Sequence, residues 1–441
     1  MREMKDSGVE WIGEIPSDWK TARIKQLFTF GKGLPITKDN LVENGVSVIS
    51  YGQIHSKSND GIHIQDDLIR YVDKAFLTTN SKSLVKEGDF IFADTSEDID
   101  GCGNCIYIDR ELLLFAGYHT IIFSAEQKGD NRYLGYLFKT DAWRSQIRKQ
   151  VTGVKLFSIS RRILSDVSVI MPQEIGERIR IADYLDDKCA KINSIIEKQQ
   201  VILEKLKEYK LSIITESVTK GLSHFVDVKS SGVDAIGDIP IHWGCTKLRY
   251  LHHGLTDGTH GTFERLESGR LLLSSKNVRD EGLIISDNES YISEEDYQNI
   301  VAKGFPKKKD VLLCCIGASI GRCVLYEFDD PIAFQRSVIM IRPGNHVNPE
   351  FLLYSMQSKS TIVQEQLLVN QSAQPGLYQG LVSEIYLTVP PLDEQNVIAD
   401  FLKSSINKID IQTKKRTDMI LELGNFKKAL IYEVVTGKMK V

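Results

Sequence analysis

Two stretches of the chain place apolar residues at a seven-residue spacing, which is typical of long helices that pair side by side. The repeating positions are Leu185, Ile192, Gln199, Leu206 and Ile213 in the first stretch, and Leu402, Ile409, Arg416, Leu423 and Leu430 in the second. A second seam is expected three residues further on, at Ile195, Ile202, Tyr209, Met419 and Phe426. We predict that the two helices pair with each other as an antiparallel coiled coil, although helices of another protein would satisfy the same pattern.

Proline and glycine mark the ends of both predicted helices. Pro172 precedes the first and Pro390-Pro391 the second, while Gly221 and Gly437 follow their last turns. Proline ahead of a helix and glycine just past its end is the usual arrangement. The helices are therefore expected within residues 172–221 and 391–441.

The chain is an internal repeat. Residues 7–19 recur as residues 231–243, with eight of thirteen positions identical. The correspondence continues to the end of the chain, where Ile181-Ala-Asp-Tyr-Leu185 overlies Ile398-Ala-Asp-Phe-Leu402. A period of about 220 residues is too long for a solenoid and indicates duplicated domains.

The part of each repeat that precedes its long helix has the pattern of a mixed α/β domain. Short β-rich runs lie between glycine-rich turns at residues 47–50, 89–92 and 120–123, and again at 310–316 and 337–341. A helical stretch follows in each repeat, over residues 132–151 and 349–368. We expect a first globular domain at 1–171, a central helix at 172–221, a second globular domain at 222–390 and a C-terminal helix at 391–441.

Composition fits a globular protein of the cytoplasm. Apolar residues make up 42% of the 441 residues and charged residues 26%. No run approaches the eighteen apolar residues of a membrane-spanning helix, and residues 1–16 lack the apolar centre of a signal peptide. Seven cysteines are few and odd in number, which favours a reducing compartment. The net charge of −4 means that any nucleic-acid contact must come from local basic surface.

Motifs for catalysis are missing. The sequence has no P-loop, no H-E-x-x-H, no G-x-S-x-G, no N-P-P-Y or D-P-P-Y loop of amino-methyltransferases, and no Pro-Asp dipeptide of the simplest nuclease signature. Cys102-Gly-Asn-Cys105 is a lone pair without the second pair that zinc requires. We therefore expect a chain without catalytic residues, metal or cofactor.

Basic residues gather in one part of the first repeat. Residues 139–162 hold seven basic residues and one acid, among them Lys149, Lys155, Arg161 and Arg162. Contact with phosphates is the functional interpretation, and a solvated helix face is the simple structural one. The counterpart in the second repeat, Asn370 to Gln379, is neutral and rich in hydrogen-bonding groups, including Gln374 and Tyr378. Amides suit adenine edges, whereas arginine and lysine suit guanine.

With these features the chain resembles the DNA specificity subunits of type I restriction-modification systems. The resemblance rests on the G-x-x-W/A-I-G-x-I-P-x-x-W openings at Gly8–Trp19 and Gly232–Trp243, on Asp257-Gly-Thr-His260 followed by Leu273-Ser-Ser-Lys-Asn-Val278, and on Pro390-Pro-Leu-Asp-Glu-Gln395. The first helix start departs from the last motif, reading Met171-Pro-Gln-Glu-Ile-Gly-Glu-Arg178. The first domain offers Gly33-Leu-Pro-Ile-Thr37 in place of D-G-T-H.

The resemblance implies a recognition subunit without catalysis of its own. Each target domain would read half of a bipartite site on double-stranded DNA, and the helices would fix the gap and dock adenine methyltransferase subunits, two in number. Restriction and translocase subunits would join them for cleavage. The DNA contacts expected outside the basic loop and its counterpart are Tyr51, Gln53, His260, Lys276, Asn277 and Arg279.

Two other functional classes remain open at this point. A coiled-coil scaffold with two protein-binding domains would need no DNA, and a nuclease with an unusual site would turn over substrate by itself with a metal. Within the family, a subunit that serves methylation only, without restriction, is equally compatible with the sequence.

Overall fold

The computed structural model describes residues 3–125, 130–153, 155–223, 225–370 and 376–441. The chain divides into two compact units. Unit 1 consists of Met1–Lys198 with Met419–Val441, and unit 2 of Gln199–Asp418. Each long helix therefore contributes one part to each unit.

Unit 1 is built on two sheets. The first is antiparallel, and every residue of its strand β9 is buried, which explains the continuous apolar run of Phe90 to Ala93. Its strand order is β11 (Cys105–Tyr107), β9 (Phe90–Ala93), β13 (Thr120–Ala125), β4 (Phe28–Lys32). The second sheet contains one parallel pair, β6 with β12. Its order is β5 (Leu41–Val42), β7 (Arg70–Val72), β6 (Val46–Ile49), β12 (Leu114–Ala116), β8 (Leu84–Val85).

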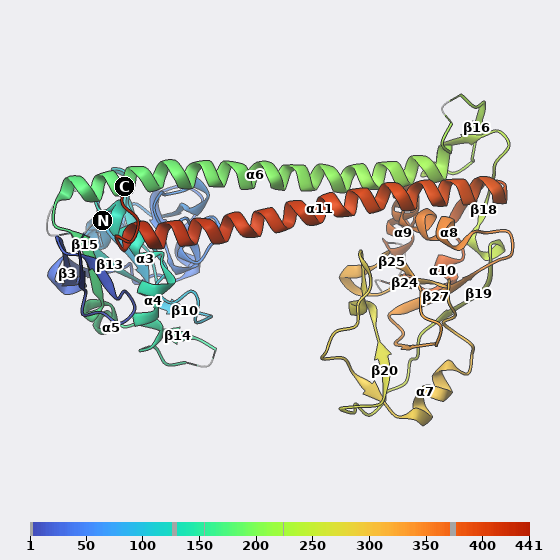
Figure 1. Ribbon diagram of the computed structural model, residues 1–441, viewed down its shortest axis with the longest axis horizontal. Helices are drawn as coiled ribbons and strands as arrows, with labels where there is room; N and C mark the ends of the chain where they lie inside the picture. Colours follow the sequence, from blue (N-terminus) through green and yellow to red (C-terminus); the bar gives the residue numbers. More distant parts are fainter. Residues whose placement is uncertain (1–2, 126–129, 154, 224, 371–375) are drawn as a thin grey trace. The chain divides into compact units, whose positions relative to one another are not determined.

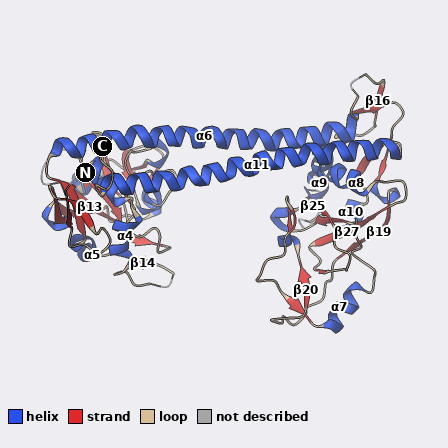
Figure 2. Ribbon diagram, viewed as in Figure 1, coloured by secondary structure: helices blue, strands red, loops and turns tan. Residues whose placement is uncertain are grey.

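Unit 2 repeats this plan. Its antiparallel sheet has the equivalent order β25 (Cys323–Leu325), β24 (Val311–Cys314), β27 (Val338–Pro343), β19 (His252–Asp257). Its second sheet again holds one parallel pair, in the order β23 (Tyr291–Ile292), β20 (Arg270–Leu273), β26 (Ala333–Phe334). The duplicated, mixed α/β architecture expected from the sequence is thereby confirmed (Figure 2).

Shorter elements complete each unit. The paired short strands are β1 (Met4–Asp6) with β2 (Glu14–Pro16), β3 (Trp19–Arg23) with β15 (Ser168–Pro172), β10 (Thr95–Ser96) with β14 (Phe157–Ser158), β16 (Val228–Ser230) with β17 (Asp238–Pro240), β18 (Gly244–Lys247) with β28 (Tyr386–Val389), and β21 (Val278–Arg279) with β22 (Gly282–Leu283). The short helices are α1 (Tyr51–Ile54), α2 (Phe76–Thr79), α5 (Arg161–Asp166), α7 (Glu294–Val301) and α10 (Gln379–Val382).

The helical stretch expected in each repeat is two helices rather than one. Unit 1 has α3 (Arg132–Phe138) and α4 (Asp141–Arg148), and unit 2 has α8 (Pro349–Gln357) and α9 (Lys359–Asn370). The break falls at Thr140, whose hydroxyl accepts the N–H of Trp143, and at Ser358, whose hydroxyl accepts the N–H of Thr361. A side-chain cap of this kind starts a new helix.

The two long helices are α6 (Ile175–Lys220) and α11 (Leu392–Val435), as the heptad pattern predicted (Figure 1). Gly221 and Gly437 follow them with φ of +78° and +72°, a left-handed conformation that ends a helix and favours glycine. No helix of the described ranges is both long and apolar enough to cross a membrane.

A buried tryptophan ties the opening motif of each repeat to the start of its long helix. The indole Nε1 of Trp243 donates to Glu394 Oε2 at 3.0 Å, and Trp19 Nε1 donates to Glu177 Oε1 at 3.3 Å. Glu394 is the acid of the P-P-L-x-E-Q motif. Glu177 therefore accepts the equivalent hydrogen bond in the first repeat, although the start of the first helix lacks the rest of that motif.

The helix pair is antiparallel, and its central polar residues bond each other. In unit 2, Arg416 Nη1 donates to Gln199 Oε1 at 2.8 Å, and Lys210 Nζ donates to Asp410 Oδ1 at 2.7 Å. Residue numbers therefore increase along α6 in the direction in which they decrease along α11. In unit 1, Lys427 Nζ donates to Asn193 Oδ1 at 2.7 Å. The predicted pairing residues contribute to the buried seam. Leu185, Ile192, Leu402, Ile409 and Leu430 are buried, and Leu206, Ile213 and Leu423 are partly buried.

The second seam lies four residues from the first, not three as expected. Cys189 and Ile196 of α6 belong to the core of unit 1, as does Val434 of α11. The expected seam residues Ile195, Tyr209, Met419 and Phe426 are instead exposed, and Ile202 is partly buried. In a heptad the apolar positions are separated alternately by three and four residues. The positions of the first seam therefore do not by themselves show whether the second seam lies three or four residues further on.

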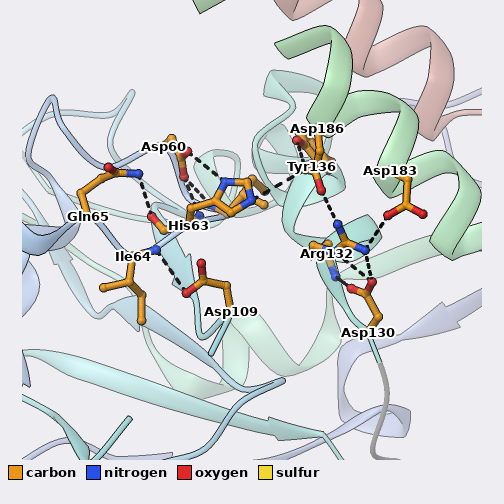
Figure 3. Close-up of polar contacts among 11 residues, drawn as sticks. Asp60, His63, Ile64, Gln65, Asp109, Asp130, Arg132, Tyr136, Asp183 and Asp186 are labelled. Carbon is orange, nitrogen blue, oxygen red and sulfur yellow. Dashed lines mark hydrogen bonds and ion pairs between the residues drawn. The ribbon is translucent and has the colours of Figure 1, made fainter. Parts of the chain in front are cut away.

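Charged residues connect the first turns of α6 to the globular part of unit 1 (Figure 3). The Arg132 guanidinium of α3 contacts the carboxylates of Asp130, Asp183 and Asp186, and the Tyr136 hydroxyl donates to Asp186 at 2.5 Å. His63 lies 3.9 Å from Asp186, and its pKa is raised, chiefly because it donates a hydrogen bond to Asp60. These contacts fix the helix to the globular part of its own unit.

Candidate nucleic-acid interface

In unit 1, a short strand pair brings the basic segment to one end of the antiparallel sheet. Strand β14 pairs with β10, and the N–H of Ile159 donates to the carbonyl of Asp94 at 2.7 Å. Asp94 directly follows β9. Lys155 precedes β14 and Arg161 follows it, and both side chains are exposed. The Arg161 guanidinium lies 4.8 Å from the centre of the Phe30 ring.

An aromatic group lies at the same end of this sheet. The Tyr51 ring is 5.6 Å from Tyr118 and 5.4 Å from His119 between ring centres. His119 Nδ1 is 3.3 Å from Asp94 Oδ1, and its backbone carbonyl accepts the N–H of Asp94. Contacts therefore run from Tyr51 through His119 and Asp94 to the basic segment. Exposed aromatic rings beside cations can stack on bases or nucleotide sugars.

Lys149 lies apart from this group. It follows the last turn of α4, and its ammonium is 3.3 Å from Glu10 Oε2 in an exposed ion pair. Arg162 is exposed in the first turn of α5. Of the four basic candidates, Lys155 and Arg161 thus directly flank strand β14, with Arg162 next to them.

In unit 2, Asp257 connects two predicted segments. Its carboxylate is 2.6 Å from His260 Nε2 and accepts a hydrogen bond from Gln379 Nε2 at 2.5 Å. Gln379 begins α10 directly after the exposed Tyr378, and the N–H of Leu377 donates to the carbonyl of Cys315. His260, Tyr378 and Gln379 therefore meet at the end of β19. Gln374 lies outside the described residues.

A buried carboxylate organises the second predicted segment of unit 2. The Glu289 side chain is 1% exposed and lies 2.9 Å from Lys276 Nζ. Burial alone would raise the pKa of Glu289, but hydrogen bonds from Ser286, Lys276 and Asn277 lower it to about 2. The Lys276 ammonium is held beside an ionised group, while Arg279 remains exposed on β21.

Asn277 is buried, and its side-chain amide is hydrogen-bonded within the fold. It is 2% exposed, and its amide donates to Glu289 Oε1 at 2.6 Å while its carbonyl oxygen accepts the N–H of Ser274 at 3.0 Å. Gln53, at the matching position of the first repeat, likewise accepts the N–H of Ser50 at 3.1 Å. Both amides cap a short helix, although the Gln53 side chain is only partly buried.

The same four segments meet in each unit, with different side chains. The N–H of Leu377 bonds to Cys315 in unit 2 as Ile159 does to Asp94 in unit 1. Ser337 accepts the N–H of Cys315 as His119 accepts that of Asp94. Gly33 and Gly258 both lie too close to a neighbouring carbonyl to carry a side chain. Residues 377–379 of unit 2 thus take the place of residues 159–161 of unit 1.

The sequence-based choice missed residues that the fold places in these groups. Tyr118 and His119 follow β12, and their counterparts Arg336 and Ser337 follow β26. Asp257 and Gln379 were also absent from the predicted set. The clue to these residues in the sequence was their position, because each lies within two residues of the end of a strand or the start of a short helix.

Within the described ranges, no three His, Cys, Asp or Glu side chains are grouped to hold a metal ion. Cys102 and Cys105 are both buried free thiols, and burial raises the pKa of Cys105 to about 12, which keeps it protonated.

Comparison with known proteins identifies relatives along most of the chain. The type I restriction modification DNA specificity domain matches residues 16–217 and 266–421. The specificity subunit of the type I restriction enzyme MjaVIII of Methanocaldococcus jannaschii is 26% identical over 438 residues, covering 97% of this chain and 94% of the relative. That of EcoBI of Escherichia coli is 22% identical over 381 residues, covering 84% and 79%.

A solved structure shares the fold. A chain from a study of complex assembly and conformational transition in the type I R-M system superposes with a TM-score of 0.68 at 13% identity. The match covers 96% of the present chain and 99% of the other.

Proposed function

The chain belongs to the family of type I restriction modification DNA specificity subunits, and we propose that each of its units reads one half of a bipartite site on double-stranded DNA. The observation that carries this proposal is the convergence of four matching segments at one sheet end in both units. The frame is the same in each, and the exposed side chains differ. Two domains that recognise two different half-sites would need a common frame with different exposed side chains.

The side chains of the two groups suit different contacts. In unit 1, Lys155, Arg161 and Arg162 would bind phosphates or guanine edges, with Tyr51 and His119 beside them. In unit 2, Gln379 would bind adenine, because its amide matches the adenine donor and acceptor. His260 and Tyr378 would border that contact, and Lys276, Arg279 and Arg336 would supply positive charge.

The helices α6 and α11 would set the gap between half-sites and dock the partners. Their exposed apolar residues, Ile195, Met419 and Phe426 in unit 1 and Tyr209 in unit 2, would contribute to the contacts with two adenine methyltransferase subunits. Restriction and translocase subunits would join them in the complete complex. Partners that share the phosphate contacts would reconcile DNA binding with the net charge of −4.

The chemistry would reside in the partners. A methyltransferase must take its target adenine out of the helix, and this chain would bring that enzyme to the site without catalytic residues or a cofactor of its own. Work on chromosomal DNA would place the complex in the cytoplasm.

The test is DNA binding by the chain assembled with its methyltransferase. We expect sequence-selective binding whose affinity falls steeply with salt, measured by fluorescence anisotropy on duplexes with and without the site. Assembly with no preference among duplexes would instead support a protein-binding scaffold.

A further inference from the structure

Unit 2 contains a deep cleft. Its walls come from α6, α9 and α11 together with the turn before β25, and its volume is about 1270 Å³. Leu206 and Ile214 of α6 and Ile409 and Ile411 of α11 give it largely apolar sides. Apolar clefts with a few well-placed polar groups are the usual form of ligand sites.

One carboxyl group in the wall of this cleft has no partner. Glu365 of α9 is 3% exposed, and its Oε1 atom is buried without a hydrogen bond among the described residues. A side chain on Gly321 would overlap the other carboxyl oxygen, so the acid lies directly against backbone. Burial raises the pKa of Glu365 to about 8. A buried polar group left unpaired lowers the stability of the fold.

The cations that line the cleft do not pair with Glu365 within the described residues; they are Lys207, Lys210, Arg322 and Lys414. Arg322 Nε is 3.1 Å from Asp280 Oδ1, Lys210 Nζ is 2.7 Å from Asp410 Oδ1, and Lys207 Nζ is 3.0 Å from Glu204 Oε1. The carboxyl group of Glu365 therefore has no counter-charge within the described part of the chain.

The repeat shows that the fold does not require an acid here. Gln364 accepts the N–H of Tyr386 and donates to its carbonyl, and Gln146 of unit 1 does the same with Ser168. The next residues are therefore equivalent, and they are Glu365 in unit 2 and Ile147 in unit 1. Ile147 is fully buried against Gly103, the counterpart of Gly321. One copy fills the position with an alkyl group, and the other with a carboxyl group beside a cleft.

We propose that this cleft binds a small organic cation, an alkylammonium or alkylguanidinium, with Glu365 as the counter-ion and the helix residues as the apolar walls. A cation at hydrogen-bond distance would favour the ionised carboxylate and satisfy its free oxygen. The alkyl stem would contact Leu206 and Ile409, which also belong to the helix pair of unit 2. The ligand would thus stabilise the packing of α9 on the two long helices.

The test is titration of the purified full-length chain with n-hexylamine and n-butylguanidine. Calorimetry measures the binding, and thermal unfolding measures the stabilisation. n-Hexanol, which has the stem of n-hexylamine without its charge, is the control ligand. Glu365→Gln and Glu365→Ile remove the charge, and Glu281→Gln removes an exposed acid of the same cleft. We expect both cations to bind at least tenfold more tightly than hexanol. Both Glu365 variants should lose that preference while melting no lower than the wild type, and Glu281→Gln should keep it.

Equal binding of hexanol, or unchanged binding by Glu365→Gln, would overturn the proposal. It would also be overturned if neither cation binds at millimolar concentration. If Glu365→Gln then weakens assembly with the methyltransferase, the missing cation is a side chain of that partner and not a free ligand.

Discussion

Arg161 shows how a cation can be positioned and still remain available to DNA. Its guanidinium lies over the Phe30 ring, and a cation–π contact orients the group without neutralising it. Lys149, by contrast, is engaged by Glu10. Lys155 precedes β14 and Arg161 follows it. Ile159, next to β14, bonds to Asp94, and Asp94 contacts His119. At the scale of the residue, Lys155 and Arg161 should carry the phosphate contact of unit 1.

Replacing Lys155 and Arg161 together by alanine should weaken DNA binding of the assembled complex about tenfold or more. The dependence of the logarithm of affinity on the logarithm of salt should also become shallower by about 2, because two phosphate contacts are lost. Anisotropy titrations at several salt concentrations measure both quantities. Lys5→Ala with Lys20→Ala, the same charge change on strands β1 and β3, is the matched control. An unaltered slope in the first variant would exclude the assignment.

Single residues also show where the sequence stops being informative. Asn277 and Gln53 were reasonable base readers by type, yet both amides cap a short helix through the N–H of a serine three residues earlier. A polar residue in a turn can serve the backbone or a ligand, and its spacing to that serine was the available clue. His119 and Gln379 carried no motif, and only the pairing of distant strands brings them to the interface.

At the scale of the element, the two long helices are the most predictable part of the molecule. Heptad spacing, the preceding prolines and the terminal glycines placed both helices within a few residues of their ends. The second seam was misplaced because steps of three and four both keep a heptad. The pair uses the residue four further on, such as Ile196, and leaves Ile195 exposed. The breaks at Thr140 and Ser358 escaped notice because a capping hydroxyl inside an apolar pattern leaves the pattern intact.

Two adjacent alanine substitutions distinguish the two seams. Ile196→Ala should lower the free energy of unfolding of the isolated chain by about 1–2 kcal/mol, because Ile196 packs in the core of unit 1. Ile195→Ala should change it by less than about 0.5 kcal/mol, as expected for an exposed position. Urea titrations followed by circular dichroism measure both. A larger loss for Ile195→Ala would mean that the seam runs where the sequence first indicated.

At the scale of the whole molecule, duplication explains the organisation of the chain. Each unit has the same sheet order, the same parallel strand pair and the same tryptophan-to-glutamate bond at its helix start. The polar residues Gln199 and Arg416, which hold equivalent positions in the two repeats, bond each other. The exposed side chains of the candidate recognition groups differ between the units, which would allow the two half-sites to differ while the scaffold stays the same.

Lengthening both helices together tests their role in spacing. Seven residues inserted after Gln199 and seven inserted before Arg416 lie on the same side of the central polar pair, because the helices are antiparallel. They therefore preserve both the heptad and the contact between Gln199 and Arg416. The addition amounts to about 10 Å of helix, or roughly three base pairs at 3.4 Å each. We expect each half-site to be retained and the gap to grow by about that number. Insertion into α6 alone should destabilise the pair. Altered half-sites in the double insertion would show that the helices do not set the gap.

The most direct test of the central claim is a methylation map of a bacterial genome, obtained by single-molecule sequencing after co-expression of this chain with its methyltransferase. We predict N6-methyladenine in one gapped, two-part motif that disappears when this chain is omitted. Methylation that is absent although the complex assembles, or that persists unchanged without this chain, would contradict a role in DNA recognition.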